Sequence, residues 1–212
     1  EFLSMLREET RRHDIVLIFD EVMTSRLGPN GRQGEVGVIP DLTTFGKYIG
    51  GGMTFGAFGG AARLMSHFDP NGPNPLLHSG TYNNNVMSMA AGVAALEKVL
   101  TPEQVRELNA RGDGLRNRLN ETAARREVPV QVTGLGSILC IHFHDGPITS
   151  PEAARLSDPR ARALFHLEML ERGIYLARRG FISLSLPLEQ ADYDAFAEAF
   201  EDVILLMKSY LR

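Results

Sequence analysis

Two residues of the sequence have the types and surroundings needed to act together on a small molecule that contains a carbonyl group. Asp20 follows the β-branched apolar run of residues 14–19, and Lys47 follows residues 41–45 on a glycine-rich turn. A lysine on such a turn can lose part of its hydration, which favours the neutral amine that attacks a carbonyl carbon. Taken alone, Lys47 could also be an ordinary surface lysine, because most lysines are solvated.

The pair is more informative than either residue. Both residues follow predicted strands, and ligands of open α/β sheets bind at the carboxyl ends of the strands. A pyridoxal phosphate cofactor requires such a pair, since a carboxylate keeps its pyridine nitrogen protonated and an amine binds its aldehyde. Val22, two residues beyond Asp20, would then lie against the ring as an apolar platform. Alternatively, Asp20 and Glu21 are strand-end acids that cap the next segment.

A nucleotide-binding loop is a second interpretation of Lys47, and we reject it. Gly46 and Lys47, with glycines nearby, superficially resemble the phosphate-binding loop of NTPases. That loop needs Ser or Thr directly after its lysine to coordinate magnesium, whereas this sequence has Tyr48. The spacing therefore does not support a phosphate loop.

The elements that position the pair indicate an α/β region. The apolar run 14–19 is typical of a central parallel strand that is buried on both faces. Residues 27–37 are rich in Gly, Pro and Asn, which predicts a loop. The other elements expected here are strands at 41–45 and 55–58, a helix from about residue 61, a loop at 71–77 and a helix at 86–100.

The second half of the sequence predicts a smaller α+β domain. Thr101, Pro102 and Gln104 form a strong helix start with a capping box, and an apolar stripe follows. We place the domain boundary here, with one domain at 1–103 and the other at 104–212. The elements expected beyond this helix are strands at 130–132, 137–143, 174–176 and 181–186, and helices at 158–172 and 192–210.

Three strings of the sequence resemble the class III aminotransferases of fold type I, a family that includes glutamate-1-semialdehyde aminomutase and β-amino-acid aminotransferases. They are LIFDEVMTSR, PDLTTFGKYIGGGMTFGAFGG and HSGTYNNNVMSMAAG. Members of this family are about twice as long, so the resemblance covers their second half. It implies an α/β fold: the second half of the large cofactor-binding domain, with a mostly parallel sheet and helices, plus a smaller α+β C-terminal domain.

The resemblance also implies roles for single residues. Lys47 would form the Schiff base with pyridoxal phosphate and move the substrate proton, and Asp20 would bind the pyridine nitrogen. Val22 would pack on the ring. Thr81 would reach the phosphate of the cofactor in the neighbouring subunit, which implies a homodimer with shared active sites. His78 lies near Thr81, and we assign it no catalytic role.

The substrate is indicated by the segment around Arg179. The pattern from Arg179 through residues 180–188 is similar to that of β-phenylalanine aminotransferases, in which Arg179 would hold a carboxylate. We therefore expect transfer of an amino group from a β-amino acid, aromatic or not, to a 2-oxo acid such as 2-oxoglutarate. The alternatives are an aminomutase of the same fold, a non-catalytic dimerisation module, and an Arg179 that only forms a surface ion pair.

Composition excludes several classes of function. The net charge is −4 and long runs of like charge are absent, which argues against a nucleic-acid partner. No apolar run is long enough for a membrane helix, and Cys140 is the only cysteine, so we expect a cytoplasmic protein without disulfides. His142 and His144 share a strand face but lack a third ligand, so we predict no metal site.

The start of the sequence falls within a helical pattern, so we expect that upstream residues are missing. The family's N-terminal half carries the phosphate-binding loop of the same subunit and the aromatic residue that stacks on the ring. We therefore expect the 212-residue chain alone to bind pyridoxal phosphate weakly or not at all and to be inactive.

Overall fold

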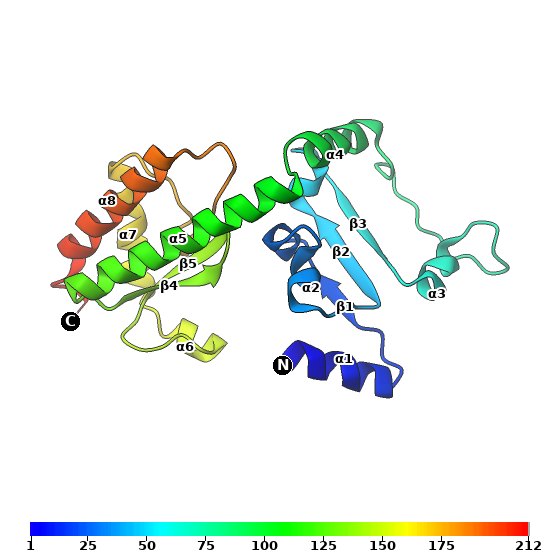
Figure 1. Cartoon of the computed structure of the whole chain (residues 1–212), viewed down its shortest axis with the longest axis horizontal. Coiled ribbons are helices and arrows are strands. Elements are labelled where there is room, and N and C mark those ends of the chain that lie inside the picture. Colours follow the sequence, from blue (N-terminus) through cyan, green and yellow to red (C-terminus); the bar gives the residue numbers. More distant parts are fainter. Residues whose placement is uncertain (212) are drawn as a thin grey trace. The chain divides into compact units, whose positions relative to one another are not determined.

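The computed structural model describes residues 1–211, and the chain forms two compact units, Glu1–Arg106 and Glu107–Arg212. Figure 1 shows their elements along the chain. The first unit contains α1 (Phe2–Arg12), β1 (Ile18–Asp20), η1 (Thr24–Leu27), α2 (Gly31–Val36), β2 (Leu42–Gly46), η2 (Lys47–Gly50), β3 (Gly56–Gly60), α3 (Ala62–Met65), η3 (Ser66–Phe68) and α4 (Val86–Lys98).

The sheet of the first unit has the strand order β1-β2-β3. β1 and β2 are parallel, and their register pairs Asp20 with Thr44. β2 and β3 are antiparallel, and a side chain at Gly60 in β3 would collide with the backbone carbonyl of Asp41. Glycine in β3 therefore allows close approach of the chain where β2 begins.

A partly buried ion network holds the amino ends of these strands. Asp41 accepts hydrogen bonds from Arg7 at 2.8 Å and Arg63 at 2.7 Å, and from the backbone N–H of Leu17 at 2.9 Å. The Leu17 N–H and the two guanidinium groups outweigh desolvation and lower the pKa of Asp41 to about 2. The network joins α1, the start of β1, the start of β2 and α3.

The first predicted strand is shorter and more exposed than its sequence indicates. Asp14 has a left-handed backbone with φ of +52°, and regular pairing begins only at Ile18. Ile15, Val16 and Ile18 are exposed, and Ile18 reaches 54% exposure, so burial on both faces was wrong for these described residues. β1 has one neighbouring strand, β2, within residues 1–211, which leaves its other edge uncovered.

The predicted loop at 27–37 was also wrong, because it contains α2. Its glycine and asparagine content predicts irregular structure, but the distant Glu21 carboxylate accepts hydrogen bonds from the first-turn N–H groups of Arg32 and Gln33. Such acceptors stabilise a helix start. Gly37 ends the helix in the left-handed conformation, with φ of +66°.

The second unit has an antiparallel sheet in the order β4-β5-β6, with helices around it. Thr101 caps the helix that leads into it, because its hydroxyl oxygen accepts the N–H of Gln104 at 3.3 Å. The elements are α5 (Pro102–Arg126), β4 (Val130–Leu135), β5 (Ile138–Phe143), α6 (Pro151–Arg155), α7 (Pro159–Glu171), β6 (Phe181–Ser183) and α8 (Gln190–Met207).

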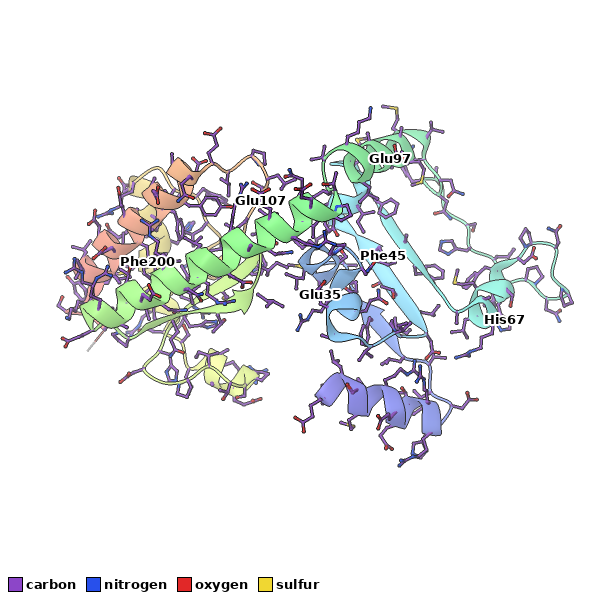
Figure 2. The ribbon with its side chains drawn as sticks, in the orientation of Figure 1. Glu35, Phe45, His67, Glu97, Glu107 and Phe200 are labelled. Carbon is purple, nitrogen blue, oxygen red and sulfur yellow. The ribbon has the colours of Figure 1, made fainter. Side chains whose placement is uncertain are left out.

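Aromatic side chains form the centre of the apolar core in this unit. Phe165 of α7 lies between Phe143 of β5 and Phe200 of α8, with ring centroids 5.5 Å and 5.9 Å apart. Figure 2 labels Phe200 on α8. Leu119 of α5 and Ile141 of β5 are fully buried in the same cluster. The three helices α5, α7 and α8 and the sheet therefore share one core.

Residues 174–176, predicted to be a strand, are irregular in the structure. The N–H of Ile174 bonds to the carbonyl of Met169 at the end of α7, and His166 Nδ1 lies 2.9 Å from the carbonyl oxygen of Leu176. The backbone groups of Ile174 and Leu176 thus bond to residues of α7 and not to a strand. The apolar residues of this segment were therefore wrongly interpreted as a strand. None of the described helices has the length and apolar content needed to cross a membrane.

Candidate active site

Asp20 and Lys47 lie at the same edge of the sheet in the first unit. β1 and β2 are parallel, so their carboxyl ends meet at one edge, where Asp20 ends β1 and Lys47 directly follows β2. Lys47 is three residues beyond Thr44, the partner of Asp20, which corresponds to about 10 Å along an extended strand. The two side chains can therefore reach a molecule seated between them at this edge.

The carboxylate of Asp20 is held by its neighbours through one oxygen. Its Oδ1 accepts the backbone N–H of Val22 at 3.0 Å and the hydroxyl of Thr44 at 3.1 Å. Its Oδ2 accepts no hydrogen bond from residues 1–211, and the residue is exposed. Asp20 thus presents an oriented oxygen to a cationic N–H of a ligand.

Lys47 is exposed and has an unusual backbone conformation. Its φ is +54°, in the left-handed region that residues other than glycine rarely adopt. Its amine makes no hydrogen bond or ion pair with any residue that the structure describes. A backbone held in a sparsely populated conformation next to an unpaired reactive group is a feature of functional sites.

The turn that carries Lys47 packs closely on α4. A side chain at Gly51 would collide with the carbonyl of Ala91, and one at Gly92 would place its Cβ 2.7 Å from the carbonyl oxygen of Ile49. The hydroxyl of Ser88 in α4 also bonds to the carbonyl of Thr54 at 2.9 Å. Glycines on both sides therefore let η2 lie directly against the helix.

Val22 lies beside the same turn. A Cβ added at Gly46 would come within 3.5 Å of Val22 Cγ1, so the apolar side chain reaches the residue before Lys47. Val22 is half-buried, which leaves part of its surface open at the sheet edge. The structure thus brings Asp20, Val22 and Lys47 together.

Glu21 has a positioning role that the sequence only partly indicated. It is 1% exposed, and its carboxylate accepts Gln33 N–H at 2.7 Å, Arg32 N–H at 2.9 Å and the Thr24 hydroxyl at 2.9 Å. Of the two acids at the strand end, Glu21 is therefore the one that caps the next segment, because it accepts the first N–H groups of α2. Its hydrogen-bond partners lie up to 12 residues away in the sequence. The only local signal for this role was the position of the acid directly after a predicted strand.

Tyr48 and Ser25 were missed by sequence reasoning. The hydroxyl of Tyr48 donates to the Ser25 hydroxyl oxygen at 2.9 Å, which joins η2 to η1. Burial raises the pKa of Tyr48, although its bond to Ser25 and the nearby Arg26 act in the opposite direction. Burial also lowers the pKa of Arg26. No local pattern could have identified this pair, because its partners are far apart in sequence.

Thr81 and Arg179 are not on the strands and turns that carry Asp20 and Lys47. Thr81 is in an exposed turn of the first unit, and its hydroxyl bonds to no residue within 1–211. Asn85, not Thr81, caps α4 by accepting the N–H groups of Met87 and Ser88. Arg179 is in the second unit, exposed, with its guanidinium carbon 5.2 Å from the centre of the Phe181 ring.

The described residues contain no cluster of three or more His, Cys, Asp or Glu side chains that could hold a metal ion. His142 lies in β5 and has its Nε2 2.9 Å from the hydroxyl oxygen of Thr133, whereas His144 lies just beyond the end of that strand. The His142 ring is thus engaged by a neighbouring strand.

Comparison with known proteins gives one family. The family model "Aminotransferase class-III" matches residues 1–204. The chain is 50% identical over 204 residues to β-phenylalanine transaminase from Variovorax paradoxus, and the match covers 96% of this chain and 47% of that protein. It is 39% identical over 213 residues to a glutamate-1-semialdehyde 2,1-aminomutase from Lachnoclostridium phytofermentans, covering 100% of this chain and 48% of that protein.

A solved structure agrees with these sequence matches. The β-phenylalanine aminotransferase of Variovorax paradoxus superposes with a TM-score of 0.95 at 49% identity, over 98% of this chain and 48% of that one. The chain therefore spans about half the length of the relatives it matches.

Proposed function

Because the chain belongs to the class III aminotransferases and has the fold type I of pyridoxal-phosphate enzymes, we propose that it carries the cofactor lysine of an enzyme that transfers an amino group from a β-amino acid to a 2-oxo acid. The observation that carries this proposal is the placement of Asp20 and Lys47 at the carboxyl ends of two paired parallel strands. The chain spans about half of its relatives, so the activity is proposed for the natural polypeptide that contains it.

The residues at this edge fit the cofactor that the family uses. Pyridoxal phosphate, when bound, supplies an aldehyde for an amine and a ring that accepts electrons. Asp20 Oδ2 is open to a protonated ring nitrogen, Val22 offers an apolar surface at the same edge, and Lys47 Nζ has no other partner within residues 1–211. Each group that the cofactor needs from this part of the fold is therefore present.

Asp20 holds a proton on the ring nitrogen through Oδ2. The hydrogen bonds from Thr44 and from the Val22 N–H fix the carboxylate plane by its other oxygen. Such fixed orientation increases the electrostatic effect of a charged group, because it need not reorganise during the reaction.

Lys47 has two proposed tasks. Its Nζ would hold the cofactor through the aldehyde, and the same amine would move the substrate proton. Both tasks need an amine that is not held in an ion pair, and the structure supports them through the exposed, unpaired side chain of Lys47.

We propose a homodimer in which Thr81 reaches the phosphate bound by the partner subunit. Support comes from the apolar surface of α4 and of the turn before it, where large side chains are exposed. They are Leu77, Tyr82, Val86, Met87, Val93 and Leu96. Large exposed apolar side chains are typical of an interface, and in the proposed dimer Thr81 would lie at the partner's cofactor site.

The proposed amino donor is a β-amino acid whose carboxylate Arg179 holds. Arg179 is exposed and makes no ion pair with residues 1–211, which supports a guanidinium available to a ligand. The similarity to β-phenylalanine transaminase favours an aromatic β-amino acid. The aminomutase alternative is supported by 39% identity over the whole chain.

The test supplies the natural polypeptide with pyridoxal phosphate, β-phenylalanine and 2-oxoglutarate and measures glutamate. We expect glutamate to form in proportion to the β-amino acid consumed, because transamination needs an acceptor. Consumption of glutamate-1-semialdehyde without any 2-oxo acid would instead support the mutase. Without turnover of either substrate, and with no loss of assembly in Lys47→Ala, the dimerisation module would be supported.

A further inference from the structure

A side-chain hydrogen bond joins η1, which follows the strand of Asp20, to η2, which contains Lys47. The proposed chemistry does not use this bond. Tyr48 directly follows Lys47, and its hydroxyl donates to Ser25 Oγ at 2.9 Å. Ser25 is buried in η1, the segment that follows β1. The bond therefore ties the segment after Lys47 to the segment after Asp20.

Ser25 is a fixed anchor. Its backbone N–H bonds to the carbonyl of Glu21 at 3.0 Å. The Glu21 carboxylate is buried and accepts hydrogen bonds from Thr24 and from the first turn of α2, so the backbone from Glu21 to Ser25 is held at both ends. Glu21 is adjacent to Asp20, which makes Ser25 an extension of the strand end that carries the acid.

Lys47, by contrast, needs external support. Its φ of +54° is unfavourable for a residue with a Cβ, and such conformations persist only where the surrounding structure enforces them. On one side, Gly46 is the last residue of β2 and is paired with Gly56 of β3. On the other side, Tyr48 is the adjacent residue, and its side chain has a directional bond to the anchor.

We propose that the Tyr48–Ser25 hydrogen bond is a positioning device, which holds the left-handed backbone of Lys47 and thereby fixes its amine relative to Asp20. The inference rests on the proposed function, because it assigns this bond a part in cofactor attachment. Burial raises the pKa of the Tyr48 hydroxyl, so the hydroxyl remains a donor around neutral pH.

The experiment measures attachment of pyridoxal phosphate to Lys47 in the natural polypeptide and in Tyr48→Phe, Ser25→Ala and the double variant. Borohydride reduction at timed intervals fixes the attached cofactor, and mass spectrometry then gives its amount at each lysine. Lys98 serves as an internal reference, because it is an exposed lysine at the end of α4.

Each single variant is expected to attach pyridoxal phosphate to Lys47 about tenfold more weakly, the factor that corresponds to one net hydrogen bond. The double variant should lose no more than either single variant, since both changes remove the same bond. Ser25→Thr keeps a hydroxyl and should restore most of the attachment. Tyr210→Phe is the matched control, because Tyr210 is exposed and its hydroxyl bonds to no described residue.

Thermal unfolding of the cofactor-free proteins separates positioning from folding. If the single variants unfold at lower temperature but attach the cofactor like the unaltered protein, or if their losses add in the double variant, the positioning role is overturned. Should Tyr48→Phe not fold, Ser25→Ala and Ser25→Thr decide the question in the same way. Failure of the unaltered polypeptide to attach pyridoxal phosphate at Lys47 would count against the proposed function itself.

Discussion

The two units of the chain differ in what fills their interiors. In the second unit, the buried side chains are overwhelmingly apolar and form one cluster around Phe165 and Phe200. In the first unit, the buried apolar side chains within residues 1–106 are Leu17, Val38 and Val105. Apart from Pro40, its other buried side chains are polar or charged: Arg7, Thr10, Glu21, Ser25, Thr43 and Ser88.

This difference shows how each unit obtains its structure. An apolar core stabilises through burial but gives little directional control, whereas hydrogen bonds fix atoms in specific positions. In the first unit, side-chain hydrogen bonds hold the Asp20 carboxylate and join Tyr48, the residue after Lys47, to Ser25. Its exposed apolar side chains, such as Ile18 and Val86, are the kind of surface that a further chain or segment covers.

The largest expected effect comes from the apolar core of the second unit. Phe200→Ala removes a fully buried ring that contacts Phe165, which should lower the free energy of unfolding by about 4 kcal/mol. Urea unfolding followed by circular dichroism measures the change. Tyr210→Ala, which truncates an exposed aromatic residue, is the control and should have little effect. An equal effect of both changes would contradict the proposed core.

A smaller effect is expected from the polar interior of the first unit. Glu21→Gln keeps the size of the side chain but replaces one acceptor oxygen, so Arg32 or Gln33 N–H loses a partner. We expect a loss of about 2 kcal/mol in the free energy of unfolding. Attachment of pyridoxal phosphate should weaken with it. Glu121→Gln on the exposed face of α5 is the matched control, and an equal response there would contradict the positioning role of Glu21.

The ion network around Asp41 predicts that the stability of the first unit depends on pH in the acid range and not at neutral pH. Its pKa is about 2 in the folded protein, against the ordinary value of 3.8, so its stabilisation is present above about pH 4 and disappears as the pH falls toward 2. Asp41→Asn should remove this slope and reduce stability above pH 4. Unfolding temperatures between pH 2 and 6 measure it, and parallel curves for both proteins would refute the assignment.

The smallest effect is expected for an exposed ion pair in the second unit. Glu201 contacts Arg125 and Arg126 on the surface between α8 and α5. Solvent screens such pairs, so Glu201→Gln should leave the unfolding temperature almost unchanged. A large shift by differential scanning calorimetry would mean that surface charges, and not the apolar cluster, stabilise this unit.

Local patterns predicted the elements that carry Asp20 and Lys47 because strong signals lie within them. The glycine-rich turn after residues 41–45 and the capped helix start at Thr101 are local, and the structure has both. The family and the fold were likewise predicted from three motifs and are confirmed by the comparisons. The roles of Asp20, Val22, Lys47, Thr81 and Arg179 stay predictions.

What could not be predicted depends on partners far apart in sequence. The helix α2 forms in a glycine-rich segment because Glu21 accepts hydrogen bonds from its first N–H groups. The composition of the segment does not indicate these bonds. Likewise, the apolar run 14–19 shows that the segment of β1 is hydrophobic, but it does not show how many strands pair with β1. Tyr48 and Ser25 are ordinary residues in the sequence and become informative only through their contact.

The central claim is that Lys47 binds the cofactor covalently, and mass spectrometry after borohydride reduction tests it most directly. The natural polypeptide incubated with pyridoxal phosphate should carry the reduced cofactor on the peptide that contains Lys47, and Lys47→Ala should carry none. Lys98 and Lys208 are the remaining lysines of the sequence and should stay unmodified. Modification at either of them in place of Lys47, or an unchanged yield in Lys47→Ala, would contradict the account.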